Sequence, residues 1–110
     1  METFVKGDVV VLPFPFSDLS ASKRRPALVL ANLSGEDIIL CQITSQALKD
    51  NYSVAILEKD IVSGSLIKES NVRPNRIFTA SKTIISYKVA TVNRVKLLEV
   101  RDKIVSLLDQ

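Results

Sequence analysis

The side chains best suited to chemistry in this chain lie at the ends of two predicted strands. A basic cluster, Lys23-Arg24-Arg25-Pro26, precedes one apolar run, and a hydroxyl–amide cluster, Thr44-Ser45-Gln46, follows the next. Guanidinium groups pair bidentately with phosphate oxygens, and hydroxyl or amide groups donate to the same acceptors. The two clusters are therefore candidates for binding a phosphodiester.

A second basic pair, Arg73 and Arg76, flanks Pro74 and Asn75 further along the chain. If the fold brings both basic clusters together, a local cationic surface results. The net charge of +3 is compatible with nucleic acid but does not require it. On composition alone, two solvated loop clusters are the favoured interpretation.

Several classes of chemistry are disfavoured by the residue types present. The chain has no histidine, and its single cysteine, Cys41, lies in an apolar run where a buried, inert thiol is expected. No tight group of Cys, Asp or Glu has metal-ligand spacing. We therefore expect no metal site, no cofactor and no internal disulfide.

The chain is expected to fold as a single domain over residues 1–110. It is 46% hydrophobic and 25% charged, as folded globular proteins are. No apolar stretch approaches the roughly 20 residues that span a bilayer. The N-terminus lacks the pattern of a signal peptide, so a cytoplasmic location without membrane contact is expected.

Apolar and β-branched runs predict short strands. These cover residues 9–12, 26–31, 37–44, 52–57 and 76–81, with a last strand-like piece at Ile84-Ile85. Pro13 is expected to end the first strand because proline cannot donate to a ladder. Residues 17–23 read as a loop, residues 32–36 as a hairpin turn, and residues 60–64 as a turn or a single helical turn.

From about Asn93 the apolar period changes to 3.6, which predicts an amphipathic helix with Asn93 as its N-cap. We expect Lys96, Glu99 and Lys103 on its polar face, with Glu99 and Lys103 forming an i,i+4 pair. Short strands followed by one helix predict an α+β, mainly-β fold, in which a small curled sheet is covered by the helix.

Four motifs in order resemble the MazF/PemK toxins of type II toxin–antitoxin systems. They are Gly7-Asp8-Val9-Val10, Arg25-Pro26-Ala27-Leu28-Val29, Ile43-Thr44-Ser45 and the segment from Val72 to Thr79. The resemblance implies an SH3-like small barrel of the MazF/PemK/CcdB type with a C-terminal helix. It also implies a homodimer and a cognate antitoxin whose acidic tail covers the basic loops.

The resemblance further implies a metal-independent, sequence-selective endoribonuclease that cleaves single-stranded RNA by attack of the 2′-hydroxyl on the adjacent phosphate. Arg25 and Arg73 occupy the family's arginine positions, and Thr44 matches its threonine; these are the expected catalytic residues. Substrate-binding roles are expected for the neighbouring polar, basic and aromatic residues Lys23, Arg24, Ser45, Gln46, Asn75, Arg76 and Phe16. Phe14 and Tyr52 are further aromatic candidates for stacking on bases.

Two departures from the family pattern affect proton transfer. Asn75 stands where the family has an aspartate, and Ser20 stands where many members have a glutamate. Asp18 lies close by and is the candidate general base if the loop brings it to the site. Two alternatives stay open: a non-catalytic inhibitor resembling gyrase poisons, and a degenerate member that only binds RNA or its antitoxin.

Overall fold

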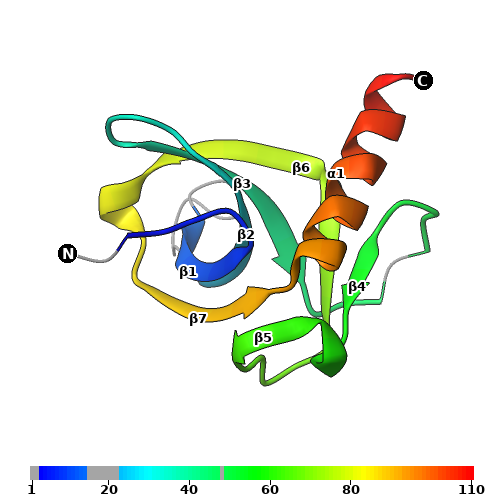
Figure 1. Cartoon of the computed structure of the whole chain (residues 1–110), viewed down its shortest axis with the longest axis horizontal. Coiled ribbons are helices and arrows are strands. Elements are labelled where there is room, and N and C mark those ends of the chain that lie inside the picture. The colour runs from blue at the N-terminus through cyan, green and yellow to red at the C-terminus, as the bar shows by residue number, and fades with distance from the viewer. Residues whose placement is uncertain (1–2, 15–22, 48) are drawn as a thin grey trace.

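The computed structural model describes residues 3–14, 23–47 and 49–110 (Figure 1). Phe16 and Asp18 lie outside the described residues. The elements follow one another as β1 (Asp8–Phe14), β2 (Lys23–Asn32), β3 (Asp37–Thr44), β4 (Val54–Ile56), the 3-10 turn η1 (Glu58–Asp60), β5 (Ile61–Gly64), β6 (Ser70–Ser81), the 3-10 turn η2 (Lys82–Ile84), β7 (Tyr87–Val92) and α1 (Arg94–Leu108).

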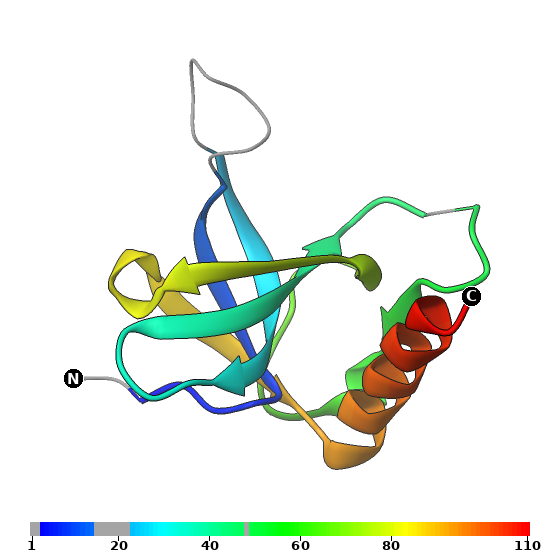
Figure 2. The same cartoon turned by 90° about the horizontal axis from the view of Figure 1, so that it is seen from above.

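The described strands form one seven-stranded antiparallel sheet in the order β4-β6-β3-β2-β1-β7-β5. The sheet curls into a nearly closed barrel, and α1 stands along one side of it (Figures 1 and 2). The predicted mainly-β barrel with a C-terminal helix is therefore confirmed. No helix in the described ranges is long and apolar enough to cross a membrane.

Apolar residues pack in two clusters on the two faces of the curled sheet. One cluster includes Leu28, Cys41, Ile43 and Val72, and α1 contributes Val100 to it. The other fills the barrel interior and contains these buried residues: Phe4, Val10, Leu12, Phe14, Ala27, Val29, Ile38 and Leu40. Cys41 is buried, as predicted, and burial raises the pKa of its thiol to about 12, which disfavours the reactive thiolate.

Pro13 in β1 and Pro26 in β2 each lie just beyond the point where pairing with one neighbouring strand stops. Pro13 does not end β1, which continues to Phe14 and pairs Pro13 with Arg24. β7 pairs with β1 only as far as Val11, so the missing N–H of Pro13 breaks no ladder bond. Pro26 likewise lies just outside the β2–β3 pairing, which begins at Ala27. The first strand therefore extends further toward the adjoining loop than its sequence predicts.

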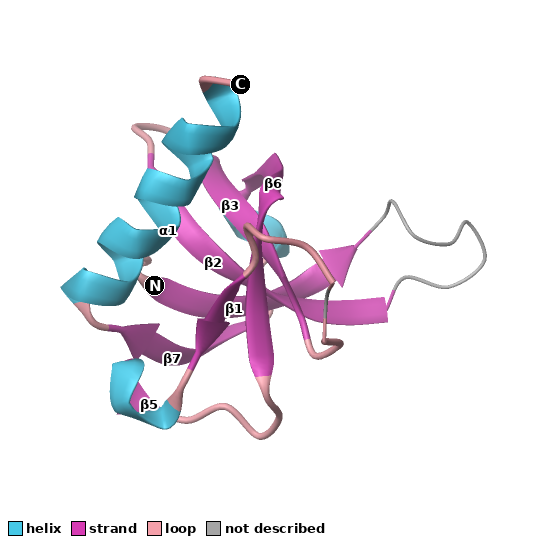
Figure 3. Cartoon of the chain, turned by 90° about the vertical axis from the view of Figure 1, so that its right-hand side faces the viewer, coloured by secondary structure: helices cyan, strands magenta, loops and turns pink. Residues whose placement is uncertain are grey.

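The prediction of a last strand at Ile84-Ile85 is wrong. These residues belong to the end of η2, where Lys82 N donates to Glu36 O and the Ser81 hydroxyl accepts from Thr83 N. The last strand is β7, which follows this turn and pairs with both β1 and β5 (Figure 3). Residues 60–64 form the end of η1 and strand β5 rather than a turn alone.

Gly64 closes β5 with a positive φ of 74°, and a Cβ at this position would lie 2.1 Å from Val89 O. Only glycine fits this close approach of β5 to β7. The residue therefore fixes the start of the loop that leads from β5 to β6.

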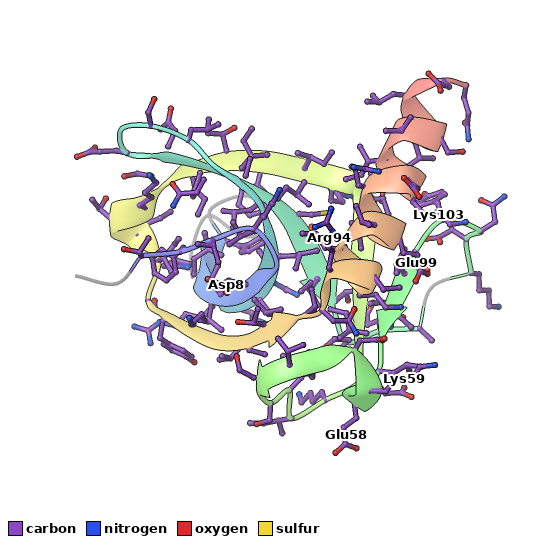
Figure 4. The ribbon with its side chains drawn as sticks, viewed as in Figure 1. Asp8, Glu58, Lys59, Arg94, Glu99 and Lys103 are labelled. Carbon is purple, nitrogen blue, oxygen red and sulfur yellow. The ribbon has the colours of Figure 1, made fainter. Side chains whose placement is uncertain are left out.

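Asn93 caps α1 as predicted, since its side-chain oxygen accepts from Lys96 N at 2.8 Å. The predicted polar face is wrong at Lys96, which is buried and lies 3.4 Å from Asp60 and 3.0 Å from Glu99. Glu99 thus pairs with Lys96 rather than Lys103, whose ammonium donates to Asn51 O (Figure 4). A carboxylate on η1, distant in sequence, explains why Lys96 turns inward.

Candidate functional site

A cavity of about 780 Å³ opens where the start of β2 meets the end of β3, and β1, β7 and the β5–β6 loop complete its wall. Its polar lining divides into cations and hydroxyls. The cations are Lys23, Arg24, Arg25 and Lys68, and the hydroxyls are those of Thr44, Ser45, Ser65, Ser70 and Tyr87. We call this the cationic cavity. The structure therefore brings the first basic cluster and the Thr-Ser pair together, as the sequence predicts.

Strand pairing explains this meeting. The β2–β3 register pairs Ala27 with Gln42, so the antiparallel strands place the residues before Ala27 beside those after Gln42. Arg25 and Thr44 consequently come to one end of the sheet. Both are half-buried, which holds them more firmly than side chains on an open loop.

The charge of the cationic cavity is not neutralised within the described chain. Its lining, as described, contains no carboxylate, and none of its four cations forms an ion pair with a described Asp or Glu. The Nε of Arg25 is buried and has no hydrogen-bond partner among the described residues. A buried donor of this kind is stabilised when an acceptor arrives, so the site is suited to an anion.

Thr44 serves the turn as well as the cavity. Its Oγ1 accepts from Gln46 N at 3.2 Å, which is the turn-capping role common for threonine. A hydroxyl that accepts one bond still has a proton to donate. Thr44 can therefore cap its own turn and donate to a ligand oxygen at once.

The second basic pair lies outside the cationic cavity as its described lining defines it. Arg73 is on β6, half-buried, and its Nε also lacks a described hydrogen-bond partner. The amide of Ser53 above all, together with that of Tyr52 and the nearby Arg73 charge, lowers the pKa of Asp50. Arg76 is exposed on the same strand. The two basic clusters therefore do not share this cavity.

Asn75 and Tyr52 line a different, smaller cavity of about 420 Å³ beside the end of α1. Gln46 also lies outside the cationic cavity, where its backbone oxygen accepts from Asn71 Nδ2 at 3.2 Å. Phe14 is buried in the barrel, with its ring centroid 5.0 Å from that of Phe78. Phe14 and Tyr52, the described aromatic residues that the sequence suggested for stacking, therefore do not line the cationic cavity.

Three kinds of lining residue were missed by the sequence. Lys68 and Ser65 come from the β5–β6 loop, Ser70 is the first residue of β6, and Tyr87 comes from β7. The alternating segment Tyr87–Val92 carries a recognisable strand pattern. Its position beside β1 depends on pairing between distant segments, so no local signal placed Tyr87 at the site.

Elsewhere in the described chain, buried charges are paired. Asp8 accepts from Val5 N at 2.9 Å and from the Thr91 hydroxyl at 2.8 Å, with Lys88 3.9 Å away. Figure 4 shows Asp8 on β1, in the wall of the barrel. Among the described residues, no three Cys, Asp or Glu side chains lie close enough to hold a metal ion.

The mainly-β, nearly closed antiparallel barrel with its C-terminal helix is a MazF-like fold. The family model described as PemK-like, MazF-like toxin of type II toxin–antitoxin system matches residues 5–108. The chain therefore belongs to the PemK/MazF toxin family.

Solved structures support the same fold. MazF from Deinococcus radiodurans superposes with a TM-score of 0.75 at 24% identity, covering 100% of both chains. A MazE–MazF complex from the same organism gives 0.73 at 26% identity, covering 98% of this chain and 97% of the other. A mycobacterial endoribonuclease in complex with its cognate antitoxin gives 0.78 at 14% identity, covering 97% and 96%. No match was found among curated proteins.

Proposed function

We propose that this protein is a toxin that cleaves single-stranded RNA without a metal. A base removes the proton of the substrate's 2′-hydroxyl, and the 2′-oxygen attacks the adjacent phosphorus. The bond to the 5′-oxygen breaks and that oxygen takes up a proton, so that a 2′,3′-cyclic phosphate and a 5′-hydroxyl form. The observation that carries the proposal is the convergence of Arg25 and Thr44 in a cavity whose described lining holds four unpaired cations.

Arg25 and Thr44 are assigned to the reacting phosphate. Negative charge grows on the nonbridging oxygens as the phosphorane forms, and fixed donors aimed at that charge lower the barrier most. Arginine stays charged throughout the accessible pH range, so Arg25 acts as a clamp rather than as a proton donor. Lys23, Arg24 and Ser45 would bind the flanking backbone from the same cavity.

The remaining predicted residues receive more distant roles. Arg73 and Arg76 lie on β6, separated from β2 by β3, and would contact RNA beyond the reacting phosphate. The 2′-hydroxyl proton needs a base, and Asp18 is retained as that candidate. Asn75 lines the smaller cavity, so its difference from the family aspartate is proposed to affect that region rather than the reacting group.

The Deinococcus and mycobacterial relatives were crystallised with their antitoxins, which supports an antitoxin partner here. An acidic segment would match the unpaired cations of the cationic cavity and exclude RNA by occupying it. We further propose a homodimer, for which the exposed apolar side chains of Val105 and Leu108 on α1 offer a surface. The proposed location is the cytoplasm, where RNA is available.

The test is incubation of the purified protein with a long single-stranded RNA in EDTA, beside the Arg25→Ala variant. We expect discrete cleavage by the wild type, with 5′-hydroxyl and 2′,3′-cyclic phosphate ends, and a rate at least ~10²-fold lower in the variant. Cleavage that requires an added divalent metal, or equal cleavage by both proteins, contradicts the proposal.

RNA binding without cleavage in both proteins would favour the degenerate, RNA-binding alternative. The absence of a carboxylate from the described lining of the cavity is the observation that keeps this second function in view. A gyrase-type inhibitor would instead show neither cleavage nor binding, and its toxicity would persist in an Arg25/Thr44 double variant.

A further inference from the structure

The cationic cavity has an apolar floor beside its charged wall. In the sheet register, Val11 pairs with Pro26 on one side and with Tyr87 on the other. Residues directly opposite one another in antiparallel strands point to the same face. All three line the cavity, so they form a continuous row across β2, β1 and β7.

Tyr87 ends this row and is open to solvent. The residue is 46% exposed, whereas Val11 and Pro26 are half-buried at the cavity. The strand start is held in place because Ser86 N donates to Val11 O at 2.8 Å. The backbone beside Tyr87 is thus fixed at the cavity, while nearly half of the surface of this residue stays accessible.

Tyr87 is the one aromatic residue among those described that line the cationic cavity. Leu66 and Ile67 of the β5–β6 loop also line the cavity, and Ile67 is 99% exposed. Cations and hydroxyls therefore adjoin an apolar and aromatic surface within one cavity of about 780 Å³. A nucleotide has the same two parts: a charged phosphate and a flat base that stacks on aromatic rings.

We infer that Tyr87 stacks on the nucleobase next to the phosphate held by Arg25 and thereby positions the RNA. This inference rests on the proposed function, because it assigns the base side of the same site. The ring, not the phenol oxygen, supplies the interaction. The residue is a positioning and specificity residue, since the strength of stacking differs between bases.

The test measures binding of a single-stranded RNA whose 2′-positions carry O-methyl groups, so that no cleavage occurs. Tyr87→Ala is expected to weaken binding by about 5- to 100-fold, the range for loss of one base–aromatic stack. Tyr87→Phe should bind within about 3-fold of the wild type because it keeps the ring. Leu33→Ala is the control, because Leu33 is exposed in the turn between β2 and β3 and lines neither cavity; it should leave binding unchanged. Thermal unfolding confirms that each variant is folded.

A second arm uses the same RNA with single abasic sites along its length. One abasic position should remove the difference between wild type and Tyr87→Ala, which identifies the stacked base. The inference is overturned if Tyr87→Ala binds the RNA with the same affinity as the wild type. Equal loss in Tyr87→Phe and Tyr87→Ala also overturns it, because the hydroxyl would then be the functional group.

This design separates the inference from the proposed function. Binding of an uncleavable RNA is measured whether or not the wild type cleaves a natural one. A protein that does not cleave but shows the Tyr87 effect has lost the proposed activity while keeping the base site. A protein that cleaves without a Tyr87 effect keeps the activity and refutes the stacking role.

Discussion

Two groups of positive charge in this molecule differ in what surrounds them. Lys96 is buried at the start of α1 and is neutralised by Asp60 at 3.4 Å and Glu99 at 3.0 Å. The four cations of the cationic cavity have no described carboxylate within ion-pair distance. The first arrangement fixes the helix to η1, whereas the second leaves positive charge for a ligand. Pairing thus separates a cation that serves the fold from the cations that we propose serve binding.

The largest expected effect comes from Arg25→Ala. Cleavage of single-stranded RNA should fall by about 10²–10³-fold, since one preorganised donor to the developing charge is lost. The free energy of unfolding should change little, because the buried Nε has no described partner to lose. Initial cleavage rates and urea unfolding check both statements. A variant that is strongly destabilised would place Arg25 among the cations that serve the fold.

The converse is expected of Lys96→Met. Removing Lys96 leaves the buried Asp60 carboxylate without its cation, which should lower the free energy of unfolding by about 3 kcal/mol. Cleavage at a temperature where the variant stays folded should match the wild type. Arg101→Met is the control, because the Arg101–Asp102 pair is exposed and should contribute no more than ~0.5 kcal/mol. An equal loss of unfolding free energy in Lys96→Met and Arg101→Met would show that Lys96 is no more important for the fold than an exposed cation.

Stability should also depend on pH through Asp60. Burial raises the pKa of this carboxyl, but the Leu57 amide and the Lys96 ammonium outweigh burial, and the pKa is lowered in the folded state. The unfolded pKa is about 3.9, so the stabilisation is complete above that value and is lost as pH falls through the lower folded pKa. Urea unfolding between pH 2 and 6 should show this loss, flattened in Lys96→Met. An unchanged pH profile in that variant would contradict the pairing.

A smaller effect is expected from Lys68→Ala. If Lys68 contacts a phosphate, the variant should reduce the slope of log affinity against log salt concentration by about 0.7 for single-stranded RNA. Lys59→Ala is the matched control, since Lys59 projects from η1 away from the barrel (Figure 4). Equal slopes for Lys68→Ala and the wild type would place this lysine outside the binding surface.

The smallest effect is expected from Asn75→Asp. Asn75 lines the cavity beside the end of α1 and not the cationic cavity, so an added carboxylate there should leave the cleavage rate within about 3-fold of the wild type. Cleavage assays in EDTA measure this directly. A large gain in activity would show that the substitution of the family aspartate limits catalysis.

The sequence predicted features that depend on residues close together in the chain, and it missed several that depend on contacts between distant segments. Asn93 was placed correctly as a helix cap because capping depends on residues three positions apart. The meeting of Arg25 with Thr44 was predicted from family motifs, and the β2–β3 ladder explains it. Burial of Lys96 was missed because its partner Asp60 is brought in by the tertiary fold. Tyr87 was missed for the same reason, since β7 reaches the site only by pairing with β1.

The most direct test of the account is a map of backbone amide chemical shifts on addition of uncleavable single-stranded RNA to the isotope-labelled protein. The account predicts the largest changes at residues 23–25, 44–45, 65–70 and 87–89, which enclose the cationic cavity, and smaller ones at Arg73 and Arg76. The segments around Lys96 and around the smaller cavity at 104–110 should change little. Shifts centred on α1 and β4, with the cationic cavity silent, would contradict the account.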